Sequence, residues 1–471
     1  MIRLILILTF ILNICFARDN YKRVKVSKKL AQKRDRIYTL SQKHYKKKDY
    51  FSALDTIAKM YKYQTPDQNV QHYIEKLASK SGTYYFNTYT DLELRKMNIP
   101  TTDLIMAKRN LYLNKLKSVH RRLKRMPKGH RLYPESLLVK ATAYHFEKNY
   151  EKAIKTYQKC SEVAYGWEQR NDEKTKQMRY FTVIKETCTI NIARIHYKQQ
   201  NYKLAIQHYE EIPKTSFKWP YTLLEKAWAN YNIGNYNRSL GILMTYSSPL
   251  LESYFMPEAE VLKALNYYKL CLYEDALAVV EKYYTTYSPR SKSLKNIIKK
   301  EGKKELYFFD LMFTPIAEKE KENKFLRNLI TQMTKRIKYN LDLNTLYAMN
   351  REIYRANKSA NLPLLLGLQK DLKQQINHYV KVSMYKFINE IHKLSSEMFD
   401  LKLEILSRKR ELAYKNRTFN KDRSRGDFKN IKQEENQDFW TFKNAFWADE
   451  LGDYSFALTS TCKTRRVKLN E

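Results

Sequence analysis

Histidine and cysteine are the side chains best suited to hold a metal or act as a nucleophile, and their spacing here favours neither chemistry. The nine histidines form no His-Glu-x-x-His or His-x-His motif, and none lies near a cysteine at metal-ligand spacing. No Gly-x-Ser-x-Gly element occurs. The nine glycines include no Gly-x-Gly pair, so we expect neither a dinucleotide-binding fingerprint nor a P-loop. We therefore expect no catalytic residue, no metal and no cofactor in a protein that is not an enzyme.

The five cysteines leave one open question of chemistry. Cys15 lies in the N-terminal apolar run, and the other four are too far apart for a Cys-x-x-Cys site; they are Cys160, Cys188, Cys271 and Cys462. An even number permits disulfides in an oxidising compartment. Buried unpaired thiols are the alternative, and the sequence does not fix a pairing.

Residues 1–17 have the pattern of a secretory signal peptide. Arg3 precedes an apolar run from Leu4 to Phe16, and Cys15 and Ala17 place small residues at the −3 and −1 positions of a cleavage site. As a helix this run is about 20 Å long, short of the roughly 30 Å of a bilayer core. We expect cleavage and a periplasmic or secreted mature protein, with an uncleaved anchor or a lipoprotein as the alternatives.

Composition favours helices and a basic surface. The chain has 9 Gly and 11 Pro against 39 Tyr, and hydrophobic residues make up 43% of it. The formal net charge is +39, and the stretch HRRLKRMPKGHR at 120–131 is especially basic. Such a charge is either a solvated surface or a means of attracting anionic envelope polymers or lipid head groups. Export argues against nucleic acid as a partner.

A tyrosine recurs at a fixed place in a helix–turn–helix pattern: Tyr50, Tyr150, Tyr202, Tyr236 and Tyr273. In the last four copies an alanine precedes the tyrosine by nine residues, and in every copy a small residue follows it by three. Small residues on both helices let the two backbones approach closely. A unit of this kind cannot bury its apolar face alone, so copies stack into a solenoid.

This spacing resembles the tetratricopeptide repeat, and the resemblance implies an all-α solenoid of units at 34–67, 134–167, 186–219, 220–253 and 257–290. The match departs from the family late in the second helix, where larger residues replace the usual small one: Cys160, Ile212, Tyr246 and Tyr283.

The remaining segments complete the domain prediction. Residues 18–133 form an N-terminal helical region that contains the first unit, and the solenoid proper covers 134–290. Long helices follow at 291–415, where apolar residues three and four apart from Ile391 to Leu412 indicate a coiled-coil seam. We expect an antiparallel hairpin or ordinary bundle helices there, then a flexible linker at 416–437 and an aromatic segment at 438–471.

A partner-binding groove is one interpretation of the first helices of the repeats. Aromatic and basic residues fall on the face that lines the concave side of a solenoid: His145, Arg194, Tyr197, Lys198, Trp228, Tyr231, Tyr268 and Lys269. The alternative is that these residues only pack between helices.

The C-terminal segment carries the most specific pattern in the chain, DFWTFKNAFWADELGDYSFALTSTCK at 438–463. An aromatic cluster on a tail implies a groove to fill, in this chain or another. The segment resembles a motif of periplasmic tetratricopeptide-repeat proteins of deltaproteobacteria associated with the gliding-motility machinery of the cell envelope. The matching residues are Phe439, Trp440, Phe442, Trp447, Asp449, Glu450, Leu451, Gly452, Tyr454 and Cys462.

Two functions follow from these patterns. The resemblance implies an exported, non-enzymatic scaffold that binds one or more proteins of a cell-envelope complex. The charge suggests instead a module that binds anionic polymer such as peptidoglycan or glycan. Binding that fails as salt rises would favour the polymer, and salt-tolerant retention of a protein would favour the scaffold.

Overall fold

The computed structural model describes most of the chain in two compact units. Unit 1 comprises residues up to Tyr133 together with Asp342–Asp371, and unit 2 comprises Pro134–Leu341 and Leu372 onward. The residues described are 31–58, 60, 66–169, 176–313, 324–334, 337–356, 361–415, 417–419, 431, 438–443, 445–459, 462 and 464–466. The expected signal peptide at 1–17 and most of the expected linker at 416–437 lie outside them.

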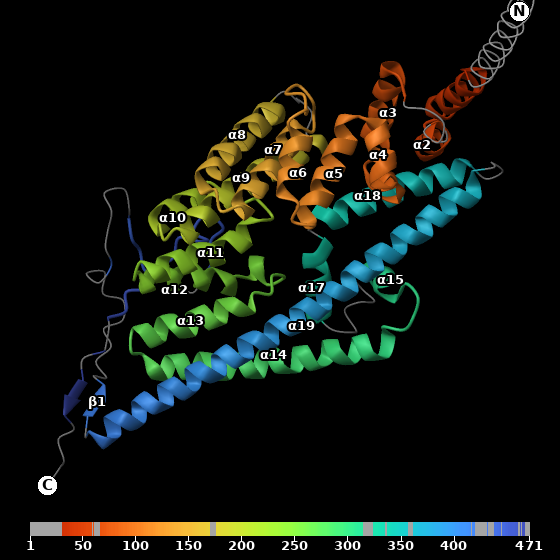
Figure 1. Cartoon of the computed structure of the whole chain (residues 1–471). Helices are drawn as coiled ribbons and strands as arrows, with labels where there is room; N and C mark the ends of the chain where they lie inside the picture. The colour runs from red at the N-terminus through yellow and green to blue at the C-terminus, as the bar shows by residue number, and fades with distance from the viewer. Residues whose placement is uncertain are drawn as a thin grey trace, which may run out of the picture. The chain divides into compact units, whose positions relative to one another are not determined.

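The structure is helical almost throughout, so the prediction of an all-α repeat fold is confirmed (Figure 1). Among the described residues, the first element of unit 1 is a helix over residues 31–46. The elements that follow it are α2 (Tyr50–Ala58), α3 (Gln68–Ser81), the 3-10 turn η1 (Tyr84–Thr88), α4 (Asp91–Met97), α5 (Pro100–Tyr112) and α6 (Leu116–Leu123).

Unit 2 contains four consecutive helix pairs, which form the solenoid. The pairs are α7 (Tyr133–Phe146) with α8 (Tyr150–Gln169), α9 (Lys176–Lys198) with α10 (Tyr202–Glu210), α11 (Trp219–Asn232) with α12 (Tyr236–Met244), and α13 (Pro257–Lys269) with α14 (Tyr273–Glu301). Short 3-10 turns η2 (Thr245–Ser247) and η3 (Pro249–Leu251) lead from α12 toward α13.

The small residues of the repeat lie inside the packed helix pairs. All of them are fully buried, on the first helices (Ala141, Ala193, Ala227, Ala264) and on the second (Ala53, Ala153, Ala205, Ser239, Ala276). In the first copy Ser41 takes the alanine's place, and its hydroxyl donates to the Ala53 carbonyl at 2.8 Å.

The turn inside each unit is also the same in every copy. A residue with positive φ lies two positions before each repeat tyrosine: Lys48, Lys148, Gln200, Gly234 and Cys271. The next N–H donates to the carbonyl five residues back, as Asn149 does to Tyr144 at 3.0 Å and Asn235 to Asn230 at 2.9 Å. This left-handed ending is the Schellman type of helix cap. Its five-fold recurrence establishes a helical repeat protein.

Two short helices, α15 (Tyr307–Phe313) and α17 (Lys324–Thr334), and two longer ones, α18 (Ile337–Arg355) and α19 (Leu362–Tyr414), follow the repeats. The expected seam of α19 is buried at Ile391, Leu394, Met398, Leu401 and Ile405. Hydrogen bonds join α19 to the last repeat in antiparallel order, from Tyr283 Oη to the Ile391 carbonyl (3.0 Å) and from Lys381 Nζ to the Gly302 carbonyl (3.0 Å). The long helix therefore pairs with α14, which runs beside it in Figure 1.

Two details differ from the expectation. The last repeat does not end near 290, because α14 continues through Pro289 to Glu301; the added turns bury Leu294 and Ile298. The expected linker begins with a strand, β1 (Arg417–Phe419), which pairs antiparallel with β2 (Thr464–Arg466). The two ends of the C-terminal region are thereby joined.

Candidate functional site

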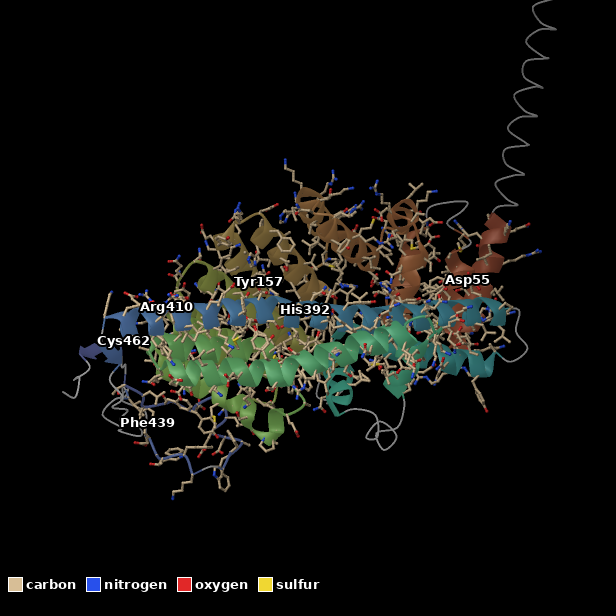
Figure 2. All side chains as sticks on the ribbon, turned by 90° about the horizontal axis from the view of Figure 1, so that it is seen from below. Asp55, Tyr157, His392, Arg410, Phe439 and Cys462 are labelled. Carbon is tan, nitrogen blue, oxygen red and sulfur yellow. A yellow bond between two sulfur atoms is a disulfide. The ribbon has the colours of Figure 1, made fainter. Side chains whose placement is uncertain are left out.

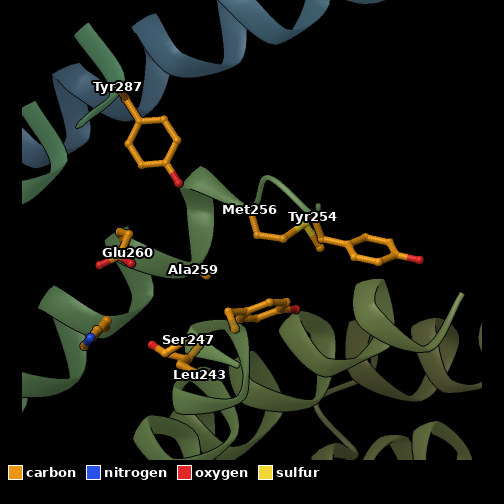
Figure 3. A pocket seen from close by; sticks show the side chains of 9 residues that line it. Leu243, Ser247, Tyr254, Met256, Ala259, Glu260 and Tyr287 are labelled. Carbon is orange, nitrogen blue, oxygen red and sulfur yellow. The ribbon is translucent and has the colours of Figure 1, made fainter. Parts of the chain in front are cut away.

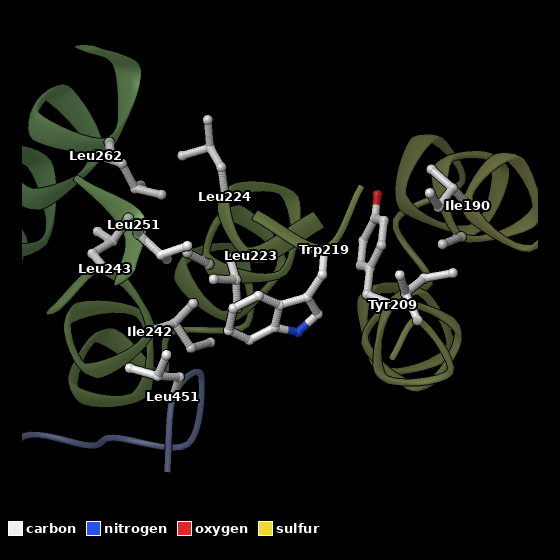
Figure 4. Close-up of a cluster of buried hydrophobic side chains, with 14 of the residues drawn as sticks. Ile190, Tyr209, Trp219, Leu223, Leu224, Ile242, Leu243, Leu251, Leu262 and Leu451 are labelled. Carbon is white, nitrogen blue, oxygen red and sulfur yellow. The ribbon is translucent and has the colours of Figure 1, made fainter. Parts of the chain in front are cut away.

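The C-terminal segment lies against the third repeat of the solenoid, with its ends marked by Phe439 and Cys462 in Figure 2. Leu451 is its anchor. Only 4% of this side chain is exposed, and it belongs to the core cluster that includes Trp219, Leu223 and Ile242 (Figure 4). The tail is thus part of the hydrophobic core of the repeat.

Two glycines allow this close approach. A Cβ at Gly241 of α12 would lie 1.9 Å from the Tyr454 carbonyl oxygen, so only glycine leaves room for the tail backbone. In the tail itself, Gly452 has φ +87°, and a Cβ there would lie 2.9 Å from the Trp219 ring. Its N–H donates to Thr245 Oγ1 at 2.9 Å. Both glycines are needed for geometry, one on the receiving helix and one on the segment received.

A charged clamp follows the anchor. Asp453 forms ion pairs with Lys214 at 2.8 Å and with Arg238 at 3.2 Å. Arg238 also donates to the Tyr454 carbonyl at 2.9 Å. Burial by itself would raise the pKa of Asp453, but the hydrogen bond from Lys214 and the neighbouring cationic charges outweigh it and hold that pKa below its ordinary value. The carboxylate is therefore ionised at neutral pH and holds the tail to Lys214 and Arg238 of the solenoid electrostatically.

Asn237 of α12 then holds the tail by three hydrogen bonds. Its backbone carbonyl accepts from Phe456 N at 3.1 Å, and its side-chain amide both accepts from Leu458 N (3.1 Å) and donates to the Leu458 carbonyl (2.9 Å). The Phe456 and Leu458 side chains pack on a small core cluster around Leu240. An amide side chain thus satisfies an extended backbone much as a neighbouring strand would.

A disulfide closes the attachment. Cys462 pairs with Cys271, the positive-φ residue in the turn of the last repeat, and Cys160 pairs with Cys188 to join α8 to α9. All four cysteines outside the N-terminal run are therefore paired. Sequence reasoning left the pairing open, because the partners are 191 and 28 residues apart and only the fold brings them together.

The aromatic residues of the segment divide into two sets. Phe446 and Tyr454 pack on the repeat core, with their ring centroids 5.8 Å apart. Trp440, Phe442 and Trp447, which we call the aromatic platform, are 67%, 36% and 63% exposed. The Phe442 ring contacts that of Phe446, with the centroids 5.2 Å apart and the planes tilted by 59°, and Trp440 Nε1 donates to Glu450 at 2.9 Å. These contacts position two of the three platform side chains. Asp449 beside it is exposed, while Phe439 and Glu450 are half-buried.

The expected groove residues lie at equivalent places in successive repeats, and each aromatic ring meets the repeat tyrosine of its own unit. The centroid distances are 5.9 Å for His145 with Tyr150, 5.3 Å for Tyr197 with Tyr202, 5.5 Å for Tyr231 with Tyr236 and 5.5 Å for Tyr268 with Tyr273. Tyr45 and Tyr50 form the same pair in the first unit, at 5.6 Å. These rings therefore pack the helix pair inside each unit.

Polar contacts join neighbouring first helices along the same face. Arg194 binds Glu225 through two nitrogens, at 2.6 and 2.9 Å, and Trp228 Nε1 donates to Glu258 at 2.8 Å. Burial and the nearby charges of Lys198 and Arg194 lower the pKa of His145, which favours the neutral ring.

Lys198 and Lys269 follow the aromatic residues Tyr197 and Tyr268 on this first-helix face. Lys198 lies over the Tyr150 ring at 5.5 Å, and Lys269 is exposed. Tyr268 donates to Glu404 of α19, so the long helix covers the last of these positions.

One small cavity lies inside unit 2. A cavity of about 80 Å³ lies between α12 and α14, lined by residues that include Tyr246, Glu260 and Tyr287 (Figure 3). Pockets for small molecules usually measure about 300 Å³ or more. Within the described residues no group of three or more His, Cys, Asp or Glu is placed to hold a metal ion, and none of the helices there is long and apolar enough to span a bilayer.

Comparison with known proteins gives no family. No family model matches the chain, and no curated protein matches its sequence. Among solved structures, the apo form of RapI aligns at 11% identity over 80% of this chain and 98% of its own, with a TM-score of 0.34. A circular tandem repeat protein with novel repeat topology aligns at 11% identity over 81% and 92%, with a TM-score of 0.17. Because both scores are low, the repeat assignment rests on this chain's own turns and packing.

Proposed function

We propose that the chain is an exported, non-enzymatic repeat scaffold that binds a protein of the cell envelope through the aromatic platform. The observation that carries the proposal is the exposure of two tryptophans and a phenylalanine on a segment that is otherwise fastened to the buried core of the solenoid. Large exposed aromatic side chains held in a fixed geometry are typical of the energetic centre of a protein interface.

The fastening is part of this argument. Leu451, the Asp453 clamp, the Asn237 hydrogen bonds and the Cys271–Cys462 disulfide all act on residues 451–462, directly after the platform. These contacts fix the backbone next to the platform before a partner arrives, which lowers the ordering cost of binding. We place the partner surface here and not on the first-helix face, because the aromatic rings of that face already contact one another.

Export is supported by the two disulfides, which are typical of oxidising compartments, and by the signal-peptide pattern at the N-terminus. The partner's expected chemistry follows from the platform: an apolar pocket for indole rings, bordered by basic or hydrogen-bonding groups that meet Asp449. Association with motility machinery is the part of the proposal that depends on the tail motif alone.

The test is capture of a partner from a solubilised envelope fraction, quantified by mass spectrometry. The variant carries Trp440→Ala and Trp447→Ala, and the matched control carries Tyr112→Ala and Tyr354→Ala, which remove aromatics that are 90% and 87% exposed on α5 and α18. We expect one set of proteins to be lost with the platform variant, retained with the control, and retained as salt rises above about 0.15 M. Equal capture by both variants would overturn the proposal.

A further inference from the structure

The surface of unit 1 contains an open cavity lined only by cationic side chains. Its volume is about 430 Å³, and its lining residues are Arg121, Arg122, Lys124 and Arg125, at the end of α6 and just beyond it. We call it the oxyanion cavity. It lies in the basic stretch at 120–131, and the protein-binding role proposed above makes no use of it.

One carboxylate is shared between two of these cations. Asp103 of α5 is 7% exposed, and its Oδ1 lies 3.2 Å from Arg122 and 3.4 Å from Arg125. The Arg122 side chain is only 16% exposed, so the carboxylate fixes its guanidinium in place. Elsewhere in the described structure neither Arg121 nor Lys124 meets a carboxylate. Asp103 is thus the one carboxylate that the described contacts give to these four cations, and it contacts two of them.

The chemistry of the lining indicates the ligand. Guanidinium groups bind phosphate oxygens through paired N–H donors, whereas the ammonium of a lysine acts as a compact point charge. A group that presents several oxygens and more than one negative charge satisfies both and offsets the excess charge. The volume admits a phosphate with a substituent but leaves the cavity open to solvent, as the end of a larger molecule would require.

We propose that the oxyanion cavity binds a phosphate group, supplied either by a soluble phosphate compound or by a phospholipid head group. Arg122 is the pre-positioned donor, Arg121 and Lys124 close on the free oxygens, and Arg125 exchanges part of its contact with Asp103 for the ligand. The chain's overall charge of +39 raises the rate of encounter without providing selectivity.

Two variants of equal charge test this inference. Arg121→Gln with Lys124→Gln removes two cavity cations, and Lys152→Gln with Lys159→Gln removes two exposed cations of α8. Pyrophosphate binding to the full chain is measured by calorimetry at about 0.15 M salt. We expect one saturable site, weakened about tenfold or more in the cavity variant and less than about twofold in the α8 variant. Circular dichroism checks that both variants remain folded.

Vesicles identify the source of the phosphate. Sedimentation with phosphatidylglycerol vesicles, lost in the cavity variant only, would assign a lipid head group. Pyrophosphate binding without vesicle binding would assign a soluble phosphate compound. The inference is overturned if wild type binds neither probe, or if the α8 variant loses as much affinity as the cavity variant, because the attraction would then be general surface charge.

Discussion

Substituting Gly241 by alanine has opposite effects on α12 itself and on its contact with the C-terminal segment that crosses it. In the middle of a helix this change normally stabilises by about 0.5–1 kcal/mol, because alanine has the better helix propensity. Here the new methyl group would lie 1.9 Å from the Tyr454 carbonyl oxygen and 2.6 Å from the Ser455 Cα. Both are backbone atoms, so rotation of a side chain cannot relieve the clash and the tail must move away.

The expected loss can be bounded from the contacts given up. Burial of Leu451 contributes about 1.5–3 kcal/mol, and each partly exposed ion pair of Asp453 adds at most about 1 kcal/mol. After subtraction of the helix-propensity gain, Gly241→Ala should cost the full chain about 0.5–4.5 kcal/mol. In a chain that ends at residue 437 and carries Cys271→Gly, the same substitution should stabilise by about 0.5–1 kcal/mol.

The assay is urea unfolding followed by the helical circular dichroism signal, with limited proteolysis as the readout of tail release. The prediction is a change of sign: destabilising with the tail and stabilising without it. A cost of the same size in both chains would refute the reasoning, because the alanine would then disturb packing within the repeat. A gain in both would show that the tail does not cross α12 at Gly241.

Three further predictions follow from contacts elsewhere in the chain. Glu352 is 1% exposed and accepts hydrogen bonds from Phe51 N (3.0 Å) and from Ser52 N (2.8 Å) at the start of α2. Glu352→Ala leaves both N–H groups without this acceptor and should lower the free energy of unfolding by about 3 kcal/mol, whereas Glu352→Gln keeps one acceptor oxygen and should lower it by about 1 kcal/mol. Thermal unfolding measures both, and equal costs would contradict the prediction. Burial raises the pKa of Tyr283 to about 12, and the same holds for Tyr84. Because these tyrosines ionise less readily in the folded chain than in the unfolded chain, their contribution to stability is complete below pH 10 and is lost as the pH rises toward 12. The free energy of unfolding should therefore fall across that window, and it should fall less in the Tyr283→Phe variant. The Cys462→Ser variant removes the disulfide that closes a loop of 191 residues and should lower the free energy of unfolding by about 5 kcal/mol. The Cys188→Ser variant opens a loop of 28 residues and should lower it by about 3–4 kcal/mol.

The repeats could be predicted from the sequence because their code is local. An alanine nine residues before a tyrosine and a small residue three after it place both on facing helices, and all of these small positions are fully buried. The shared turn could not be predicted in the same way, because Gly234 is the one residue among the five turn positions whose type favours positive φ. Lysine, glutamine and cysteine fill the other turns, where the surrounding hydrogen bonds impose the conformation.

The attachment of the tail could not be predicted, because it depends on pairs that are more than 190 residues apart in the chain. The aromatic cluster predicted that the tail packs against an apolar surface, but nothing in the sequence linked Asp453 to Lys214 or Cys462 to Cys271. Gly241 was the available hint: a glycine in the middle of a helical pattern marks a place where another backbone comes close. The pairing of α19 with α14 could not be predicted either, because the last repeat was expected to end at residue 290, whereas α14 continues through Pro289 to Glu301.

The most direct test of the account is disulfide mapping by mass spectrometry on the protein purified from its native compartment without reductant. The account predicts two linked peptide pairs, Cys271 with Cys462 and Cys160 with Cys188, in a chain that has lost residues 1–17. Free thiols or other linkages would contradict both the docked tail and the exported scaffold built on it.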